Sequence, residues 1–414
     1  MSVITFVSAA FCNDAAVIEE ILGQSDYRVL GLEEILSEAV AASGLSEAKL
    51  MAAFSAKTSV FNRFTHEKER SVGHLRLALA NVLQQDKLII SGPVAFLVPE
   101  KITYVLRVGL VAERAFRVGE AVRLSKLSEK TALQQIRHQE EDLAALLKMV
   151  GRGEDPWDAG LYDIIIPMDK TSPGEAAGLI VEKAGSNVVA MTDHSRDILE
   201  DFRLAARVEV ELAQQGHNVA VDAQSGAITL TINKNVLMLS RLEEDLKSIA
   251  GKVSGVKSVA TRVGEGFHQA DIYRRYDFEV PAKVLLVDDE RDFVQTLSER
   301  LIMRDMGSAV AYDGESALTM IRDEEPEVMI LDLRMPGIDG MEVLRQVKTT
   351  NPDIEVIVLT GHGTEKDREL CMELGAFAFL HKPVDIGVLS RTLMEANERV
   401  QGKKKQGPSP AVGN

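Results

Sequence analysis

Five side chains that can do chemistry each follow a short apolar run in the C-terminal part of the chain: Asp288, Asp289, Asp332, Thr360 and Lys382. A short apolar run bounded by turn residues is typical of a strand buried on both faces of a parallel sheet. The carboxyl ends of such strands share one edge of the sheet, and ligands bind outside that edge. The spacing therefore predicts that three acids, a hydroxyl and an amine converge there.

The predicted cluster suits phosphoryl chemistry on a carboxylate. Crowded carboxylates repel one another unless a divalent cation neutralises them, and an all-oxygen site favours Mg²⁺. The ion would hold a phosphoryl group in line with an oxygen of Asp332 acting as the nucleophile. Thr360 could donate its hydroxyl to one phosphoryl oxygen, and Lys382 its ammonium to another. The peptide between Lys382 and Pro383 is expected to be cis, because cis bonds are largely a proline feature.

Strands and helices alternate five times around these residues. The apolar runs that predict strands are Lys283 to Val287, Val328 to Leu331, Ile354 to Leu359 and Phe377 to Leu380. Helical patterns cover Phe293 to Met303, Glu315 to Asp323, Gly340 to Lys348, Lys366 to Leu374 and Ile386 to Val400. Right-handed crossovers between parallel strands would bring all the carboxyl ends to one edge.

Residues 282–400, with these motifs in this order, resemble a response-regulator receiver domain. The resemblance implies a flavodoxin-like (βα)5 fold, with Asp332 as the phosphoacceptor. It also implies that Asp288, Asp289 and Asp332 bind Mg²⁺ and that the backbone carbonyl of Arg334 is a further metal ligand. An Asp-Asp-Glu sequence after a strand can also simply cap a helix. Agreement of all the motifs in sequence order favours the receiver.

The same resemblance assigns roles to residues around the predicted phosphorylation site. Thr360 and Lys382 fall at the positions of the family's switch residues, and Phe379 falls at that of its rotating aromatic ring. Arg334 and His362 each lie two residues past a key position. In this family such residues tune the lifetime of the acyl phosphate.

The first 190 residues predict a second parallel α/β domain, because strand and helix patterns again alternate. The expected strands are Val3 to Val7, Leu88 to Ser91, Tyr104 to Val111 and Asp163 to Met168. The expected helices are Ala15 to Leu22, Leu32 to Ala41, Ser46 to Phe54, Val72 to Leu83, Ala112 to Leu124 and Ser128 to Met149.

Three segments of this domain resemble the cytidylate kinase-like family of P-loop nucleotide kinases. They read KLIISGPVAFLV, YVLRVGLVAERAFRV and LYDIIIPMDKTSPGEAAGLI. The first resembles the family's strand-and-glycine segment before its helical hairpin. The second resembles the strand that leads into the helix before the lid, and the third resembles the last strand and helix. The resemblance implies a P-loop kinase-like fold for residues 1–190.

The phosphate-binding loop of that family is degenerate here. A P-loop needs glycines to wrap phosphates and a lysine to reach the outer ones, but the segment Ser8 to Ala16 contains neither. Asp14, beside the start of the following helix, would repel phosphate. We predict that the fold is kept and that phosphoryl transfer from ATP is lost. Residual binding of a nucleotide or a partner is a hypothesis that rests only on the fold.

The lid region departs from the family in the same way. Leu143 and Glu140 stand where the family's phosphate-binding arginine and an aspartate are expected. Arg114, Arg117 and Arg123 could still face a phosphate, but arginines on a surface helix are more often solvated.

Residues 191–264 predict a small α+β domain with the order helix, strand, strand, helix, strand. Its expected elements are Asp197 to Gln214, Asn218 to Val221, Ala227 to Ile232, Val236 to Ile249 and Val256 to Val263. This order and the phrase Val253 to Val259 resemble a BON domain. A spacer or dimerisation module is the competing interpretation. Residues 265–281 predict a linker, and residues 401–414 a disordered tail.

Composition limits the function and location of the protein. The 63 acidic and 47 basic residues give a formal net charge of -16, which argues against broad nucleic-acid binding. No apolar run approaches the length of a membrane span. The two cysteines, Cys12 and Cys371, have no metal-ligand neighbours and fit reduced cytosolic thiols. The protein is expected to be cytoplasmic.

The leading hypothesis is a response regulator of a two-component phosphorelay. It would accept a phosphoryl group on Asp332 from a histidine kinase or a histidine phosphotransfer protein, and would signal through protein contacts. A homodimer through the receiver is a further expected assembly. One alternative is a cytidylate-type nucleotide kinase regulated by its own receiver. Another is a phosphate sink, whose receiver only drains phosphoryl groups from a kinase.

Overall fold

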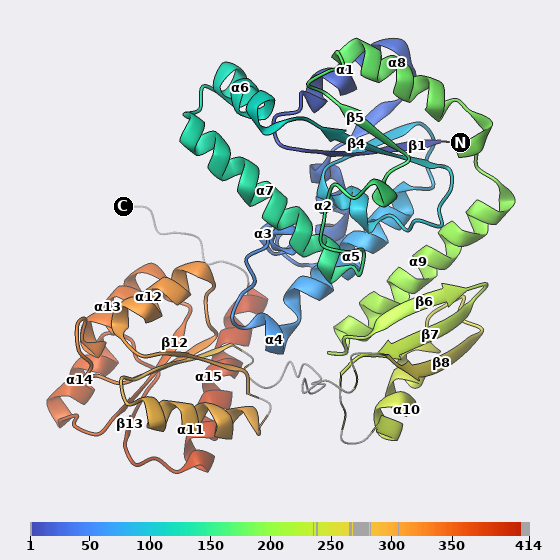
Figure 1. The fold of residues 1–414 in the computed structure, drawn as a ribbon. Coiled ribbons are helices and arrows are strands. Elements are labelled where there is room, and N and C mark those ends of the chain that lie inside the picture. Colours follow the sequence, from blue (N-terminus) through green and yellow to red (C-terminus); the bar gives the residue numbers. More distant parts are fainter. Residues whose placement is uncertain are drawn as a thin grey trace. The chain divides into compact units, whose positions relative to one another are not determined.

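The computed structural model describes residues 2–234, 236, 239–264, 267, 281, 283–304 and 306–406. The chain divides into two compact units (Figure 1). The first unit comprises Met1–Thr58 and Glu67–Tyr273, and the second comprises Ser59–His66 and Arg274–Asn414. Almost all of the predicted linker, and the predicted tail from residue 407 onward, lie outside the described residues. Among the helices that are described, none is both long and apolar enough to cross a membrane.

A parallel five-stranded sheet forms the centre of the first unit. Its order is β2-β3-β1-β4-β5, with bounds Arg28–Leu30, Leu88–Ser91, Val3–Ser8, Val105–Val111 and Ile164–Pro167. The four strands predicted from the sequence are confirmed. The sequence did not reveal β2, a three-residue strand at the edge of the sheet whose first residue, Arg28, is exposed.

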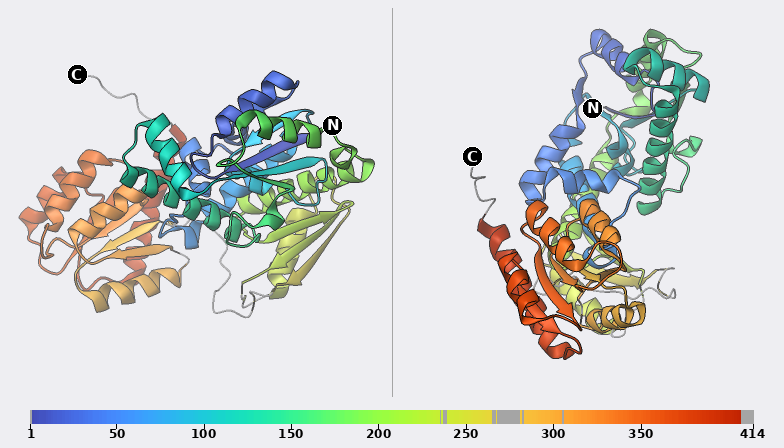
Figure 2. Two further views of the ribbon diagram at one scale, coloured as in Figure 1. Left: turned by 45° about the horizontal axis from the view of Figure 1, so that its top comes forward. Right: turned by 90° about the vertical axis from the view of Figure 1, so that its left-hand side faces the viewer.

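Helices cover both faces of this sheet. Alternate residues of β1 show the two layers. Ile4 and Phe6 pack with α1 (Asp14–Gln24) and α8 (Pro173–Ala184), which lie side by side in Figure 2. Val3 and Val7 face the opposite core. That second layer contains α2 (Leu32–Ser43), α5 (Glu67–Val82) and α7 (Glu129–Met149), with α3 (Glu47–Met51) and α6 (Arg114–Ser125) as the remaining helices of this part.

The rest of the first unit has the predicted order of helix, two strands, helix and strand. The elements are α9 (Asp193–Gln214), β6 (Ala220–Gln224), β7 (Ala227–Ile232), α10 (Leu239–Ala250) and β8 (Ser258–Val263). The central strand β7 runs antiparallel to β6 and parallel to β8. Helix α9 also joins the core of the first sheet through Leu199 and Phe202.

Several predicted boundaries in this region were wrong. Among them, α10 begins at Leu239 rather than Val236, and β8 begins at Ser258 rather than Val256. Helix α9 begins at Asp193 rather than Asp197, because the Thr192 side chain accepts the N–H of Ser195 and caps the helix. The hairpin loop was predicted to start at residue 222, but the strand continues to Gln224. Ser225 and Gly226 both have positive φ, as a tight two-residue hairpin turn requires.

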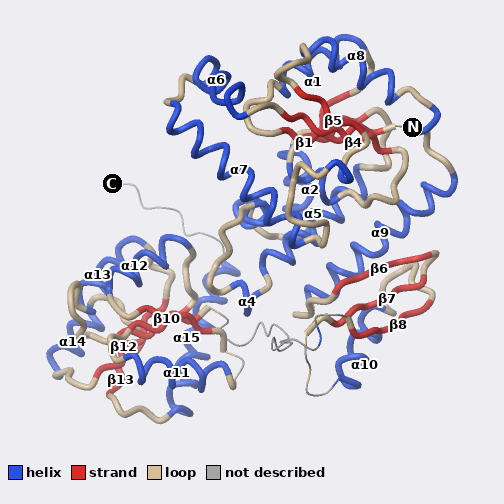
Figure 3. Tube along the Cα trace, viewed as in Figure 1, coloured by secondary structure: helices blue, strands red, loops and turns tan. Residues whose placement is uncertain are grey.

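The second unit contains another parallel sheet, drawn in red between its helices in Figure 3. Its order is β10-β9-β11-β12-β13, with bounds Ser308–Ala311, Val284–Val287, Val328–Leu331, Glu355–Thr360 and Ala378–His381. Helices α11 (Arg291–Ile302) and α15 (Ile386–Gln406) pack on one face. Helices α12 (Gly314–Asp323), α13 (Gly340–Thr350) and α14 (Glu365–Glu373) pack on the other. The short helix α4 (Asn62–Thr65) is also assigned to this unit.

The sequence prediction for this unit was incomplete at two places. It did not name β10, a short edge strand of small residues. It also ended the last helix at Val400, whereas α15 continues to Gln406. An ion pair with the sheet stabilises this extra turn of α15. Lys403 Nζ lies 2.7 Å from the buried carboxylate of Glu355, the first residue of β12.

Candidate functional site

Asp288 and Asp332 lie beside each other at the switch point of the second sheet. The chain crosses from β9 to β10 on one side and to β11 on the other, and ligands of open parallel sheets bind in the crevice at the carboxyl ends of such strands. Leu331 is in register with Val287, and the N–H of Asp332 donates to the carbonyl of Val287 at 2.9 Å. Strand pairing thus brings together two acids that are 44 positions apart in the sequence.

Three acids gather at this crevice. One carboxylate oxygen from each of Asp288, Asp289 and Asp332 lies within 4.8 Å of the others. The first and last are buried, whereas Asp289 is exposed. An all-oxygen set with one side open to water fits Mg²⁺, which keeps part of its water shell. These residues could therefore hold the ion predicted from the sequence.

The Lys382 ammonium lies within this acidic group. Its Nζ is 2.6 Å from Asp288 Oδ2, 2.9 Å from Glu290 Oε1 and 3.2 Å from Asp332 Oδ2. Burial works against the charged form of the lysine, but these hydrogen bonds and charges raise its pKa above the ordinary value. Burial also raises the pKa of Asp288, and the bond from Lys382 only partly opposes that shift. The predicted cis peptide between Lys382 and Pro383 is confirmed.

The carboxylate of Asp332 is oriented by its own loop. Its Oδ1 accepts the N–H of Leu333 at 2.7 Å, which leaves Oδ2 directed at Lys382. Gly340, the first residue of α13, lies against the backbone of Asp332, and a Cβ there would overlap the Asp332 carbonyl oxygen. The structure thus requires glycine where α13 begins.

The remaining predicted residues lie on or next to β11, β12 and β13. Thr360, at the end of β12, is 1% exposed, and its hydroxyl oxygen accepts the N–H of His362 at 3.4 Å. The side chains of Arg334 and His362 are exposed. Phe379 is half-buried against the α12 to α14 core, and its ring tip occupies the space that a Cβ of Gly363 would fill.

Sequence reasoning missed two residues of this site. Glu290 was read only as part of a helix-capping sequence, although it contacts Lys382. The ring of Phe293 lies under the same ammonium, with its centroid 4.5 Å from Nζ. The adjacency of Glu290 to two predicted metal ligands was the one available signal. Nothing in the sequence pointed to Phe293.

Comparison with known families agrees with this geometry. Residues 284–394 match the family of response regulator receiver domains. Residues 284–394 form a receiver domain. Residues 10–170 match the cytidylate kinase-like family, in agreement with the second resemblance seen in the sequence.

Two curated relatives each match about a third of the chain or less. The response regulator MprA of Mycolicibacterium vanbaalenii is 31% identical over 133 residues, which are 32% of this chain and 58% of that protein. The transcriptional regulatory protein CpxR of Klebsiella pneumoniae is 42% identical over 101 residues, or 24% of this chain and 43% of that protein. The chain thus spans less than two thirds of either relative.

Two solved structures are similar to part of the chain. A response regulator receiver domain protein from Clostridium thermocellum is 32% identical, covering 30% of this chain and 98% of that one with a TM-score of 0.28. The receiver domain of NtrX from Brucella abortus is 30% identical, covering 28% and 98% with a TM-score of 0.27.

The kinase-like part contains no comparable chemical site at the expected loop. Leu143, expected near a phosphate, is part of the apolar core. Arg114 is exposed, and Arg123 pairs with Glu120 at 2.6 Å on the surface. Arg117 is the exception. Only 5% of this residue is exposed, so the expectation that its side chain is solvated was wrong.

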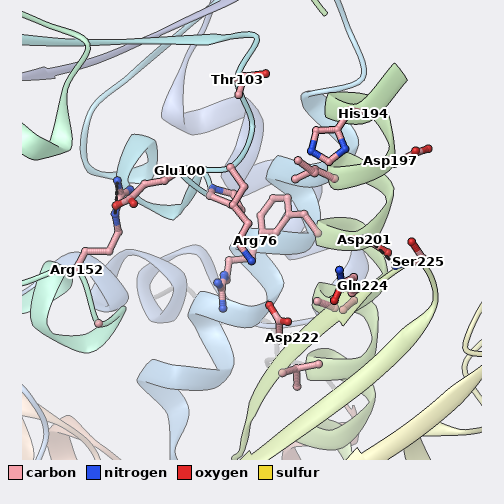
Figure 4. A pocket seen from close by; sticks show the side chains of 18 residues that line it. Arg76, Glu100, Thr103, Arg152, His194, Asp197, Asp201, Asp222, Gln224 and Ser225 are labelled. Carbon is pink, nitrogen blue, oxygen red and sulfur yellow. Dashed lines mark hydrogen bonds and ion pairs between the residues drawn. The ribbon is translucent and has the colours of Figure 1, made fainter. Parts of the chain in front are cut away.

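A cavity of about 840 Å³ lies elsewhere in the first unit, bordered by α9, β6 and the loops near residues 100 and 152 (Figure 4). Several of its charged side chains already have partners. Arg152 pairs with Glu100 at 2.9 Å, and Asp201 accepts the N–H of Ser225 at 2.8 Å. Arg76 is held by Glu209, outside the lining, at 3.2 Å. The lining also contains Lys101 and the acids Asp197 and Asp222.

Proposed function

We propose that the chain is a response regulator whose receiver accepts a phosphoryl group on Asp332. The donor is a histidine kinase or a histidine phosphotransfer protein. One observation carries this proposal. The buried Asp332 carboxylate lies at the sheet's switch point between two further acids and the ammonium of Lys382. The proposed nucleophile, the proposed metal ligands and the cation proposed for the transferred group therefore lie within a few ångströms of one another.

Asp332 acts as the nucleophile in this proposal. One of its carboxylate oxygens forms a bond to the phosphorus of a phosphohistidine, the bond from the imidazole nitrogen to phosphorus breaks, and the imidazole leaves with the electron pair. Lys382 donates an N–H to one phosphoryl oxygen, and the Thr360 hydroxyl donates to another. The hydrogen bond from Leu333 holds the carboxylate in position throughout.

Mg²⁺ fits the donor set of Asp288, Asp289, Asp332 and the Arg334 carbonyl. When bound, the ion would neutralise the carboxylates and stabilise charge on the phosphoryl oxygens. Asp288 already has its carboxylate at the crevice, where its Oδ1 accepts the N–H of Glu290 at 2.9 Å. The side chains of Arg334 and His362 are exposed to solvent, which supports the proposal that they tune acyl-phosphate lifetime.

Phosphorylation would draw Thr360 toward the phosphoryl group and free space for the ring of Phe379 to turn inward. The face formed by α14, β13 and α15 would then repack. Its two helices carry exposed apolar side chains suited to protein contact, namely Leu370 and Met372 on α14 and Val388 and Met394 on α15. We propose that the output, including a homodimer through the receiver, uses this face.

The upstream parts would act through protein contact rather than catalysis. We propose three domains, 1–190, 191–264 and 282–400, with a BON-like fold for the middle one, supported by its helix-strand-strand-helix-strand order. A cytoplasmic location is in keeping with Cys12 and Cys371, which are both free and buried. Nucleotide kinase activity gains no support, since the loop after β1 contains neither glycine nor lysine.

The proposal is tested by labelling with phosphoramidate and Mg²⁺, followed by intact-mass measurement. The wild-type chain should gain one phosphoryl group, and Asp332→Asn should gain none, while Asp339→Asn, an exposed helix cap nearby, should label normally. Labelling of Asp332→Asn would refute the site. Capture of binding partners with and without beryllofluoride separates a signalling protein from a phosphate sink. The set of bound proteins should change with beryllofluoride only if the chain signals.

A further inference from the structure

The sheet of the kinase-like part has its own switch point at β1. The chain leaves β1 for β2 and β3 on one side, and then crosses to β4 and β5 on the other. Ligands of open parallel sheets bind in the crevice at the carboxyl end of such a strand. In this chain that crevice lies at Ser8 and the loop that leads into α1.

Side chains from α6 and α7 reach into this crevice and bond to its backbone. Arg117 on α6 donates from Nε to the carbonyl of Ala10 at 2.9 Å. Gln139 on α7 donates from Nε2 to the carbonyl of Ser8 at 3.0 Å. Arg117 Nη1 also pairs with Glu140 of α7 at 2.6 Å, which ties the two helices together. The hairpin therefore satisfies carbonyl groups that would otherwise face a ligand or water.

Three polar atoms of this contact are buried without a hydrogen-bond partner among the described residues. Arg117 Nη2, Ser8 Oγ and Gln139 Oε1 are all buried and have no hydrogen-bond partner within the described part of the chain. A buried polar atom without a hydrogen-bond partner disfavours the closed contact. Because these atoms expose almost no surface, a ligand could reach them only if the hairpin moved away. The contact thus resembles a closed lid more than a prepared binding site.

Charge and backbone in the loop also disfavour a phosphate ligand. Glu140 neutralises the Arg117 guanidinium, and Asp14 opens α1 with a further negative charge. The loop adopts left-handed backbone at Phe11 (φ 64°) and Asn13 (φ 57°) without a glycine. A phosphate would therefore meet side chains and carboxylates where a P-loop presents bare N–H groups.

We propose that the α6–α7 hairpin fills this crevice as an intramolecular plug anchored by Arg117, so that the kinase-like part stays closed without nucleotide. The plug replaces the ligand with contacts from the chain itself. The kinase-like part is then a permanently shut scaffold, and any residual nucleotide role is excluded by occupancy as well as by the missing P-loop residues. This inference does not depend on phosphorylation of Asp332.

Hydrogen–deuterium exchange on the full chain tests the plug. In wild type, the amides of α6 and the first half of α7 should be protected, and millimolar ATP with Mg²⁺ should leave them unchanged. Arg117→Ala should speed their exchange by about tenfold or more, equivalent to about 1.4 kcal/mol, while β3 and β4 keep their protection. Arg114→Ala, three residues earlier and exposed, is the matched control and should change nothing.

A second variant keeps the test decisive if Arg117→Ala destabilises the whole unit. Gln139→Ala removes one neutral hydrogen bond and should speed exchange at the same amides by a smaller factor, whereas the exposed Gln135→Ala should not. Unchanged exchange in both Arg117→Ala and Gln139→Ala would overturn the proposal. ATP-induced protection of residues 8–17 in wild type would overturn it equally.

Discussion

The Lys382 ammonium lies 2.6 Å from a carboxylate oxygen of Asp288, closer than its 3.2 Å distance from Asp332. One cation thus neutralises the acid proposed to bind metal and the acid proposed to accept phosphate. Because Mg²⁺ would neutralise the same carboxylates, the lysine and the ion compete for Asp288. Phosphorylation would give Lys382 a new acceptor in the phosphoryl group.

Removal of this lysine should separate metal binding from phosphoryl transfer. Lys382→Ala should bind Mg²⁺ more tightly than wild type, because the competing ammonium is gone. The same variant should be labelled by phosphoramidate at least about tenfold more slowly, because one phosphoryl oxygen loses its charged donor. Calorimetry and labelling rates measure the two effects. Lys366→Ala, exposed on α14, should match wild type in both, and unchanged Mg²⁺ affinity in Lys382→Ala would refute the competition.

Asp288 should make the stability of the receiver depend on pH. Burial raises its pKa, so the folded chain holds this proton at a pH where the unfolded chain has released it. The stabilising contribution is therefore full at low pH and is lost as the pH rises through the raised pKa.

Asp288→Asn should accordingly melt at a higher temperature than wild type near neutral pH in Mg²⁺-free buffer. The difference should shrink as the pH falls toward the ordinary value of 3.8. Lys382 keeps Glu290 and Asp332 as partners in this variant, so it is not left unpaired. Asp289→Asn, at an exposed neighbour, should show no such shift. Thermal melts over this pH range measure the difference. A lower melting temperature of Asp288→Asn than of wild type at neutral pH would contradict the predicted direction.

Gly363 should control the position of the Phe379 ring. A Cβ at residue 363 would overlap the ring tip, so Gly363→Ala should displace the ring and destabilise the receiver by about 1–3 kcal/mol. Gly361→Ala is a matched control in the same loop, because its nearest neighbour would be 4.0 Å away. Denaturant unfolding and the NMR shifts of the Phe379 ring measure the effects. If Gly363→Ala and Gly361→Ala have the same unfolding free energy and the same Phe379 ring shifts, the position of the ring does not depend on Gly363.

Gly340 should be required for the geometry of the phosphoacceptor. A Cβ there would collide with the backbone carbonyl of Asp332, which cannot move aside as a flexible side chain can. Gly340→Ala should therefore lower both the melting temperature and the rate of phosphoramidate labelling. Gly402→Ala, with nothing near its Cβ, should leave both unchanged. A stable Gly340→Ala that labels at the wild-type rate would show that this packing is not needed.

The acid site could be predicted from sequence because its strands are buried on both faces. The run Val328 to Leu331 has the same bounds as β11, and parallel topology then fixes where Asp332 must lie. The short edge strands β2 and β10 could not be recognised, since exposed or small residues there give no apolar run.

Side-chain contacts between distant segments were beyond sequence reasoning. Arg117 is on a helix with polar neighbours, which favours a solvated arginine, yet it inserts toward Ala10, 107 positions earlier. Lys403 similarly appeared to belong to a polar tail. In the structure it forms an ion pair with Glu355 and is part of α15. In both cases the partner is set by tertiary packing, which local composition does not encode.

The most direct test of the proposed function is a crystal structure of the full chain with Mg²⁺ and beryllofluoride. The account predicts beryllofluoride on a carboxylate oxygen of Asp332 and Mg²⁺ held by Asp288 and Asp289. Lys382 and Thr360 should each donate a hydrogen bond to a fluorine atom. A structure obtained at saturating concentrations in which Asp332 carries no beryllofluoride, and Lys382 still bonds Asp288, would contradict it.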